Sequence, residues 1–411
     1  MAINAQRAFQ SDATDDNYLA QLTVPENEKY GLRKARDEIR ATLKVGLQNW
    51  ADVVERQVLF ETAALSKLAF DSMSLLSPKF KMQGSWSYHT LNCTTQEPPQ
   101  EIDLDDGMFM PISFLSQNGT THPAIISSAY FKAVEAILAP LCSKHGWNLL
   151  DDKSSCVRIE VRVGAHIDIA LYAIPDDDFE VLVEKAEASL QSRMALDQML
   201  EFADDIYPQL PSDHIMLAHR EEGWKPSDPR KLEIWFEEAL GRHGTQLRRV
   251  CRYLKGWRDS NWDTCRLSSI ALMACAVSAF DDPTSSTDGA RDDLALAMVA
   301  DRLSGLLANR IFNPVVEGQY LDEKWEDCRE GFVAAARRLS ATINRALTGS
   351  NPIEARDHLV AELGHYMPTN IAYYVTDTPG PTILAEGILK GLGSDETRRT
   401  AVKLGGDNRY G

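Results

Sequence analysis

Residues 83–112 hold the side chains with the clearest chemical potential, in the order QGSWSYHTLNCTTQEPPQEIDLDDGMFMPI. Asp103 and Asp105 are separated by one residue, so on a strand both carboxylates point to the same face. Neighbouring carboxylates repel each other, and a divalent cation between them relieves the repulsion. The Gly84-Ser85 pair predicts a turn whose N–H groups and hydroxyl suit phosphate oxygens. Together these residues suggest a site for a nucleoside triphosphate on Mg²⁺.

A third carboxylate supports this interpretation, because each half of the stretch is weak alone. A Gly-Ser pair is more often an ordinary turn, and a lone D-x-D is more often a solvated loop. Asp168, in the segment HIDIALYAIP, lies within a run that otherwise predicts a buried strand. A charge inside such a run needs a partner or a metal. His166 shares the face of Asp168, but a lone histidine there is more often a hydrogen-bonded core residue.

The composition is that of an ordinary globular protein with room for two domains. The chain has 411 residues, of which 44% are hydrophobic and 25% charged. The net charge of −17 argues against a large nucleic-acid surface, although a local basic groove is compatible with it. No apolar run is long enough to span a membrane, and no secretory signal begins the chain. The seven scattered cysteines form no zinc motif and indicate reduced thiols of a cytoplasmic protein.

The pattern of elements predicts an α+β first half followed by a helical second half. Residues 1–22 predict a loose arm, and Thr23-Val24-Pro25-Glu26 predicts a capping box before a long amphipathic helix to about residue 56, with more helix to about 73. Paired strands are expected around Gly164, and a Pro-rich stretch at 207–230 predicts the domain junction. The helices expected elsewhere cover 127–145, 178–204, 229–242, 244–258, 268–280, 290–308, 322–347, 352–364 and 381–391.

The order of these motifs resembles the polymerase-β-like nucleotidyltransferases. More narrowly, it resembles the bacterial cGAS-like enzymes called CD-NTases, and within them the cyclic GMP-AMP synthases. The resemblance is carried by QGSWSYHTLN, EIDLDDGMFMP, HIDIALYAIP, LAHREEGWKPSDP, LRRVCRYLKGWRDSNWD and SSIALMA, between residue 83 and about residue 276. The gap from Ser85 to Asp103 is longer than in the generic signature of the superfamily. The resemblance implies a nucleotidyltransferase core over residues 1–210, which includes a long N-terminal spine helix. A helical domain over 211–400 and a flexible tail over 401–411 would follow.

The resemblance also implies roles for matched residues. Asp103, Asp105 and Asp168 would be catalytic and would hold two Mg²⁺ ions, with Mn²⁺ as a possible substitute. The other nucleotide-binding positions would be Gln83, Gly84, Ser85, Trp86, Ser87 and Tyr88 around the triphosphate, with Tyr88 stacking on a base, Arg158 at the second nucleotide, Ser227 at a base edge, and Lys255 and Ser269 on the donor triphosphate.

Structural interpretations stand beside these roles. Ser268 and Ser269 could simply cap a helix, and Lys255 and Arg158 could be surface residues. Tyr88 alone, like Trp257 and Trp262, is more typical of a packing aromatic. The run Arg248-Arg249 near Arg252 could bind phosphate or form a solvated helix face.

The expected activity is synthesis of cyclic GMP-AMP from ATP and GTP with release of pyrophosphate, through a 3′–5′ or a 2′–5′ closing bond, as a second messenger in antiphage defence. The alternatives are a cyclic oligonucleotide of other bases, a transferase acting on RNA ends, and a catalytically silent nucleotide-binding scaffold. A cyclic-nucleotide-sensing effector is expected downstream. No DNA requirement is expected, since the zinc-binding insertion of the animal DNA sensor is absent. Gly411 is expected to be a point of covalent attachment by a ubiquitin-ligase-like partner.

Overall fold

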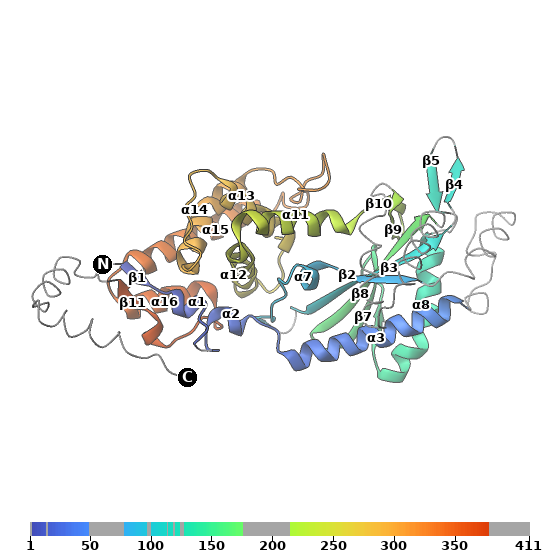
Figure 1. The fold of residues 1–411 in the computed structure, drawn as a ribbon, viewed down its shortest axis with the longest axis horizontal. Coiled ribbons are helices and arrows are strands. Elements are labelled where there is room, and N and C mark those ends of the chain that lie inside the picture. Colours follow the sequence, from blue (N-terminus) through green and yellow to red (C-terminus); the bar gives the residue numbers. More distant parts are fainter. Residues whose placement is uncertain are drawn as a thin grey trace, which may run out of the picture.

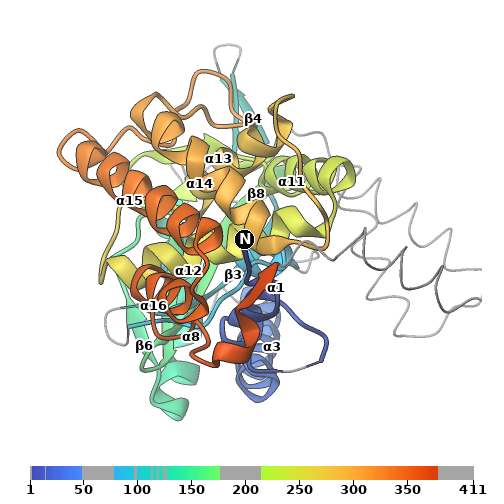
Figure 2. The ribbon, with the colours of Figure 1, turned by 90° about the vertical axis from the view of Figure 1, so that its left-hand side faces the viewer.

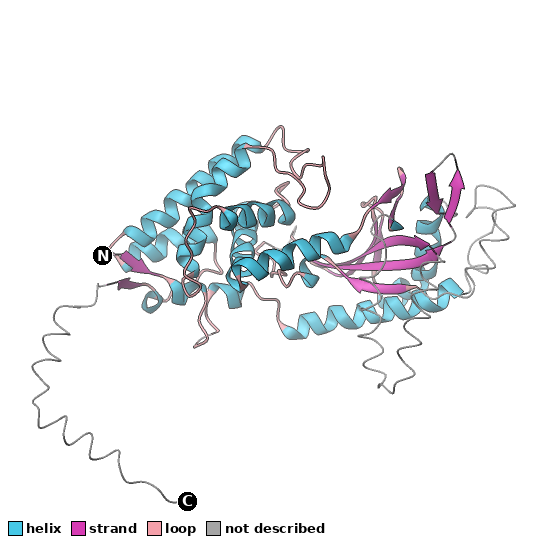
Figure 3. Ribbon diagram, turned by 45° about the horizontal axis from the view of Figure 1, so that its top comes forward, coloured by secondary structure: helices cyan, strands magenta, loops and turns pink. Residues whose placement is uncertain are grey.

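The fold has two lobes, one built around a mixed β-sheet and the other almost entirely helical (Figure 1). The computed structural model describes residues 2–13, 15–48, 78–96, 100–112, 114–117, 120–123, 127–175 and 214–377. Each lobe has its own hydrophobic core. Figure 3 shows the large sheet, flanked by helices, at one end of the molecule and the helical lobe, with one short pair of strands, at the other. This arrangement confirms the predicted α+β core with a helical C-terminal domain.

The sheet of the first lobe brings distant segments together. Its main path runs β10 (Gly223–Pro226), β9 (Met216–His219), β8 (Ala165–Pro175), β3 (Ile102–Ile112) and β2 (Lys79–Met82). β7 (Cys156–Arg162) pairs with β8, and β6 (Asn148–Leu150) pairs with β7. A separate hairpin contains β4 (Phe114–Gln117) and β5 (Thr120–Pro123). The central strands β3 and β8 are parallel, so their N-terminal ends lie at the same edge.

Two helices complete the core of the sheet lobe: α3 (Glu26–Gln48) and α8 (Ser127–His145). The apolar residues of α3 recur at helical spacing and are buried, among them Leu32, Ile39 and Leu43. Arg40, on α3, binds Asp106 of β3 through Nε at 2.7 Å, and Asp106 is only 1% exposed. An ion pair therefore joins the long helix directly to the strand that carries the D-x-D pair.

Six helices of the helical lobe come from the C-terminal half of the described chain. They are α11 (Pro229–His243), α12 (Thr245–Asn261), α13 (Ser269–Asp281), α14 (Asp292–Ala308), α15 (Arg329–Thr348) and α16 (Pro352–Leu363), followed by the short η3 (Ile371–Tyr373). Figure 2 looks onto this lobe along the length of the molecule. Asp228 and Asn351 cap α11 and α16 through their side chains, each followed by a proline in the first turn.

The N-terminal segment belongs to the helical lobe, so the prediction of a loose arm is wrong. It forms β1 (Ala2–Asn4), α1 (Gln6–Phe9) and α2 (Tyr18–Gln21), and β1 pairs with β11 (Val375–Asp377). Phe9 and Tyr18 are fully buried in the helical core. Burial of these apolar side chains favours the ordered segment and opposes the entropic cost of ordering it.

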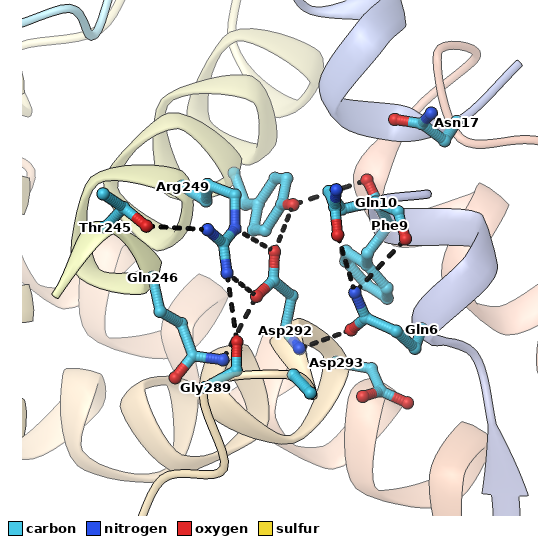
Figure 4. Close-up of polar contacts among 12 residues, drawn as sticks. Gln6, Phe9, Gln10, Asn17, Thr245, Gln246, Arg249, Gly289, Asp292 and Asp293 are labelled. Atoms are coloured by element: carbon cyan, nitrogen blue, oxygen red, sulfur yellow. Dashed lines mark hydrogen bonds and ion pairs between the residues drawn. The ribbon is translucent and has the colours of Figure 1, made fainter. Parts of the chain in front are cut away.

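Polar contacts fix the same segment to α14 (Figure 4). The Ala5 N–H donates to Asp293 Oδ2 at 2.9 Å, and the Gln6 side chain accepts from the Asp292 N–H. Asp292 is itself fully buried and accepts from Arg249 Nε at 2.6 Å and from the Tyr253 hydroxyl at 2.8 Å. These bonds satisfy a buried carboxylate that would otherwise destabilise the fold.

Other predicted boundaries shift. Strands β9 and β10 follow residue 210 but join the sheet, so the sheet lobe extends to about Pro226. The helix expected over 322–347 begins at Arg329. The Thr23 hydroxyl accepts from Arg252 at 3.0 Å and donates to the Leu19 carbonyl, whereas α3 begins at Glu26. The helices expected at about 56–73, 178–204 and 381–391, and the tail 401–411 with Gly411, lie outside the described residues.

Candidate active site

The pairing of β3 with β8 places the three predicted carboxylates together. In the parallel register Asp105 lies opposite Asp168, and Asp103 lies opposite His166. Alternation puts all four side chains on one face of the sheet. The sequence identified each carboxylate and its face, but the register that brings the two strands into contact appears only in the structure.

Asp105 is the most perturbed of the three carboxyl groups. Burial is the largest cause, and the charges of Asp103 and Asp168 add to it, so together they raise the pKa of Asp105 to about 7. Lys255 and Arg158 act in the opposite direction. A site that makes one carboxylate so costly to ionise is a site that a cation would stabilise.

The Gly-Ser turn packs directly against Asp105. Gly84 has φ +63° and begins the short helix α7 (Gly84–Ser87). A Cβ at Gly84 would overlap Asp105 Oδ2, so no other residue fits this approach. The Gln83 N–H donates to the Asp105 carbonyl at 2.9 Å, which joins the turn to the strand.

The remaining residues of this motif divide between two environments. Gln83, Gly84, Ser85 and Tyr88 line the cavity described below. Trp86 packs into the sheet core, and the Ser87 hydroxyl donates to Glu233 of α11 at 2.7 Å. Tyr88 is 7% exposed and meets Phe236 edge to face. Its ring is therefore a packing residue at the cavity wall, and base stacking by Tyr88 stays a prediction.

Arg158 is buried beside the carboxylates and is not a surface residue. It lies opposite Asp168 in the antiparallel pairing of β7 with β8. Its guanidinium binds both oxygens of Asp168, at 2.8 and 2.6 Å, and lies 3.7 Å from Asp103. The bidentate pair covers Asp168, which is 8% exposed.

The helical lobe supplies cationic and polar groups to the same site. Lys255 is 6% exposed, and its Nζ donates to the Thr90 carbonyl at 2.7 Å. Burial, followed by the charge of Arg258, lowers the pKa of Lys255 to about 8. Ser268 caps α13, and Ser269 at its first position accepts from Arg258 at 3.1 Å. Ser268 therefore caps the helix, whereas the Ser269 hydroxyl is bonded to Arg258.

A cavity of about 830 Å³ lies between the lobes. Asp103, Asp105 and Arg158 line its sheet side, and Lys255 and Ser269 line its helical side. Ser227 is not among the lining residues, although Pro229 is. Lining residues that sequence reasoning missed include Thr90, Asn92, Gln100, Lys153, Arg258 and Asp259. Arg258 follows Lys255 by three residues on a helix, a spacing that places both on one face and could have indicated it.

The basic run on α12 is structural. Arg248 donates to the Tyr88 carbonyl at 3.1 Å, Arg249 binds Asp292, and Arg252 donates to Asn92 at 2.8 Å. Trp257 is fully buried, as packing predicts. None of the seven cysteines forms a disulfide. Within the described ranges, every helix is too short or too polar to cross a bilayer.

Asp103, Asp105 and Asp168 lie on one face of the sheet, and burial and the charges of its two neighbours make Asp105 resist ionisation, an environment that a hard divalent cation would stabilise. Within the described residues no three acidic, histidine or cysteine side chains already form a metal cluster. The Arg158 guanidinium instead holds the oxygens of Asp168. A cation at Asp168 would therefore have to displace a positive charge that the fold itself provides.

Comparison with known protein families identifies the family to which this chain belongs. Residues 78–172 match the family model "Cyclic GMP-AMP synthase DncV-like, nucleotidyltransferase domain", and residues 244–376 match "Cyclic GMP-AMP synthase, C-terminal domain". The chain belongs to the DncV-like nucleotidyltransferases. The first matched region lies within the sheet lobe and the second within the helical lobe, and both contribute residues to the cavity.

Curated relatives in this family are cyclic GMP-AMP synthases. The one from Vibrio cholerae serotype O1 is 36% identical over 248 residues, which are 57% of this chain and 55% of the relative. One from Escherichia coli is 34% identical over 235 residues, 54% of this chain and 53% of the relative. The matched segment thus spans about half the length of these DncV-like relatives.

Solved structures extend the likeness over nearly the whole chain. The V. cholerae di-nucleotide cyclase in complex with GTP and 5MTHFGLU2 superposes with a TM-score of 0.77 at 27% identity, covering 92% of this chain and 100% of that one. The V. cholerae DncV structure in complex with the linear intermediate 5′ pppA(3′,5′)pG gives 0.73 at 26% identity with the same coverage. The fold is therefore that of DncV-like nucleotidyltransferases from end to end of the described chain.

Proposed function

We propose that this protein is a cyclic dinucleotide synthase that joins ATP and GTP into cyclic GMP-AMP and releases pyrophosphate. The observation that carries the proposal is the cavity between the lobes, with Asp103 and Asp105 on one wall and Lys255 and Ser269 on the other. Its volume of about 830 Å³ suits a large polar ligand. The V. cholerae relative solved with a linear pppApG intermediate supports the choice of ATP and GTP.

The reaction balances as two in-line displacements. The 3′-hydroxyl of one nucleotide attacks the α-phosphorus of the other, a P–O bond forms, and pyrophosphate leaves with the bond to its bridging oxygen broken. In the second displacement a 3′- or 2′-hydroxyl of the linear product attacks the α-phosphorus of its remaining triphosphate, which closes the ring and releases a second pyrophosphate. The proton of each attacking hydroxyl passes to solvent. Two divalent cations, Mg²⁺ or Mn²⁺, held by Asp103, Asp105 and Asp168, would stabilise the attacking and leaving oxygens.

The protein's own groups bind and orient the nucleotides. Gln83, Gly84 and Ser85 would receive the triphosphate beside the carboxylates, with Trp86, Ser87 and Tyr88 completing the motif. Lys255 would contribute point-charge recognition of the donor phosphates, next to Ser269. Arg158 would contact the second nucleotide after releasing Asp168, and Tyr88 and Ser227 would contact bases.

The product would act as a second messenger in antiphage defence, read by a cyclic-nucleotide-sensing effector in the cytoplasm. Covalent attachment at Gly411 by a ubiquitin-ligase-like partner belongs to the same proposal. These expectations rest on the resemblance to CD-NTases, and Gly411 lies outside the described residues.

The test is incubation of the purified protein with labelled ATP, GTP, CTP and UTP and Mg²⁺. Mass analysis identifies the product, and a nuclease specific for 3′–5′ bonds identifies the linkage. Asp103→Asn is the inactive control. Production of only a pyrimidine-containing product, or of only a trinucleotide, would refute cyclic GMP-AMP. Absence of pyrophosphate release would favour a silent scaffold, and extension of RNA ends at physiological salt would favour a terminal transferase.

A further inference from the structure

One polar side chain at the catalytic face has no part in the proposed mechanism: His166. It is 2% exposed and lies directly opposite Asp103 in the parallel pairing of β3 with β8. Its Nδ1 is 3.3 Å from Asp103 Oδ1, and its Nε2 is 3.1 Å from Glu101 Oε2. The imidazole therefore lies between two carboxylates of the same strand segment.

The orientation of the Asp103 carboxylate depends on His166, whereas the other two carboxylates are held in place by other residues. Asp168 is held by both nitrogens of the Arg158 fork, and Asp105 is enclosed by Gly84. The Asp103 side chain is 48% exposed, and its other charged neighbour, Arg158, is 3.7 Å away. A carboxylate with so much freedom would lose side-chain entropy when it is fixed in one orientation.

The contacts of Asp103 also favour one orientation. Both His166 and Arg158 approach Oδ1, and within the described part of the chain Oδ2 has no hydrogen-bond donor. A carboxylate anchored through one oxygen presents the other in a fixed direction. This is the arrangement that carboxylates ligating a metal obtain from their outer hydrogen bonds.

We propose that His166 is a positioning residue that holds Asp103 in the orientation for binding a divalent cation, with Glu101 fixing the imidazole ring from the other side. The inference rests on the proposed function, because it requires the carboxylates to bind a metal. It adds to that function a residue that touches neither the cation nor the nucleotide.

Two conservative substitutions separate the two ring nitrogens. The amide nitrogen of asparagine occupies nearly the place of Nδ1, and that of glutamine nearly the place of Nε2. His166→Asn therefore keeps a donor toward Asp103, whereas His166→Gln keeps a donor toward Glu101 only. His145→Gln is the matched control, since His145 also pairs with a carboxylate, Glu38 at 2.9 Å, but on α3 and α8.

The measurement is the binding of Mn²⁺ to the full-length protein in the presence of a non-reactive ATP analogue. The EPR signal of free Mn²⁺ reports how much of the ion is bound. Thermal unfolding in EDTA reports the fold of each variant. Loss of an outer hydrogen bond typically weakens metal binding about 10- to 100-fold. His166→Gln should raise the Kd for Mn²⁺ about tenfold or more, while His166→Asn and His145→Gln stay within about threefold of the unsubstituted protein. All variants should unfold in EDTA near the same temperature.

The outcomes separate the inference from the proposed function. If the unsubstituted protein binds no Mn²⁺, the metal site and the inference both fail. If it binds Mn²⁺ and His166→Gln binds equally well, only the positioning role fails. Equal weakening by His166→Asn and His166→Gln, or weakening that follows a lower unfolding temperature in EDTA, would make His166 a structural residue and overturn the proposal.

Discussion

Replacing Asp105 by asparagine should stabilise the metal-free protein, and the gain should grow as the pH rises. Asparagine keeps the shape of the side chain and removes its charge. The carboxyl group of Asp105 lies against Gly84 and near Asp103 and Asp168, where ionisation is unfavourable without a cation. Asp105 would then be a residue kept for binding a metal at a cost to the apo fold.

The magnitude follows from the two pKa values. An aspartate in an unfolded chain titrates near about 3.9, whereas the pKa of folded Asp105 is raised to about 7. The fold favours the protonated form, so this stability is fully present below the unfolded pKa and is lost as pH rises through the folded pKa. A difference of about 3 in pKa, at about 1.4 kcal/mol each, sets the total loss at about 4 kcal/mol. Between about pH 5 and about pH 8 the loss is about 2–3 kcal/mol.

The assay is denaturant unfolding in EDTA at several pH values from about 5 to about 8. The free energy of unfolding of the native sequence should fall relative to that of Asp105→Asn across this interval. Asp263→Asn is the control, because Asp263 also lines the cavity but is exposed. The gain from Asp263→Asn across this interval should be smaller than the gain from Asp105→Asn, because the Asp263 side chain is exposed to water. A pH-independent difference for Asp105→Asn would show that Asp105 is already ionised in the metal-free fold.

Four further outcomes follow from the structure. Gly84→Ala should abolish nucleotide transfer, because its Cβ would overlap the Asp105 carboxylate in a backbone of positive φ; activity assays with near-native unfolding would show it. Arg40→Ala should lower the free energy of unfolding by about 3 kcal/mol, because it leaves Asp106 buried and unpaired, and denaturation would measure this. Lys255→Met should lower kcat/KM by about 100-fold. In the unsubstituted enzyme, the affinity for nucleotides should fall as the pH rises above about 8, because Lys255 then loses its ammonium charge. Double-stranded DNA should not stimulate product formation by a chain of net charge −17, and a salt-sensitive rate increase would contradict this.

The site was predictable where local spacing determines it. Alternation on a strand placed Asp103 and Asp105 on one face, and the apolar run around Asp168 identified a buried strand. The capping and periodicity of the helical half gave most of its helices to within a few residues. The resemblance to CD-NTases assigned these motifs to one active site. The match of both lobes to DncV-like family models confirms the resemblance.

Features that depend on long-range pairing could not be predicted. The N-terminal segment of the chain is short and mostly polar, so its sequence predicted a loose arm. Phe9 and Tyr18 are nonetheless buried against Tyr253, a partner more than two hundred residues away. The same holds for Arg158, whose position opposite Asp168 follows from the register between β7 and β8. No periodicity within one segment reports which segment it will meet.

The long gap between Ser85 and Asp103 has a structural reason of the same kind. The connecting residues turn onto the helical lobe instead of returning directly to the sheet. Asn92 exchanges hydrogen bonds with Arg252, at 2.9 and 2.8 Å, and Gln100 donates to the Trp262 carbonyl at 3.0 Å. The Lys255 ammonium binds the Thr90 carbonyl of the same connection.

This connection fixes the geometry across the cavity. It leads directly into Asp103, and its partners flank Lys255 on α12 and just beyond it. Under the proposed function, β3 carries the metal-binding carboxylates and α12 carries a phosphate-binding lysine, and an in-line displacement between the two lobes needs a constant separation. Thr90, Asn92 and Gln100, which lie between the Gly-Ser turn and the D-x-D pair, bond the connection to the helical lobe on the far side of the cavity. Shortening this connection should therefore impair catalysis even though it leaves every predicted catalytic residue in place.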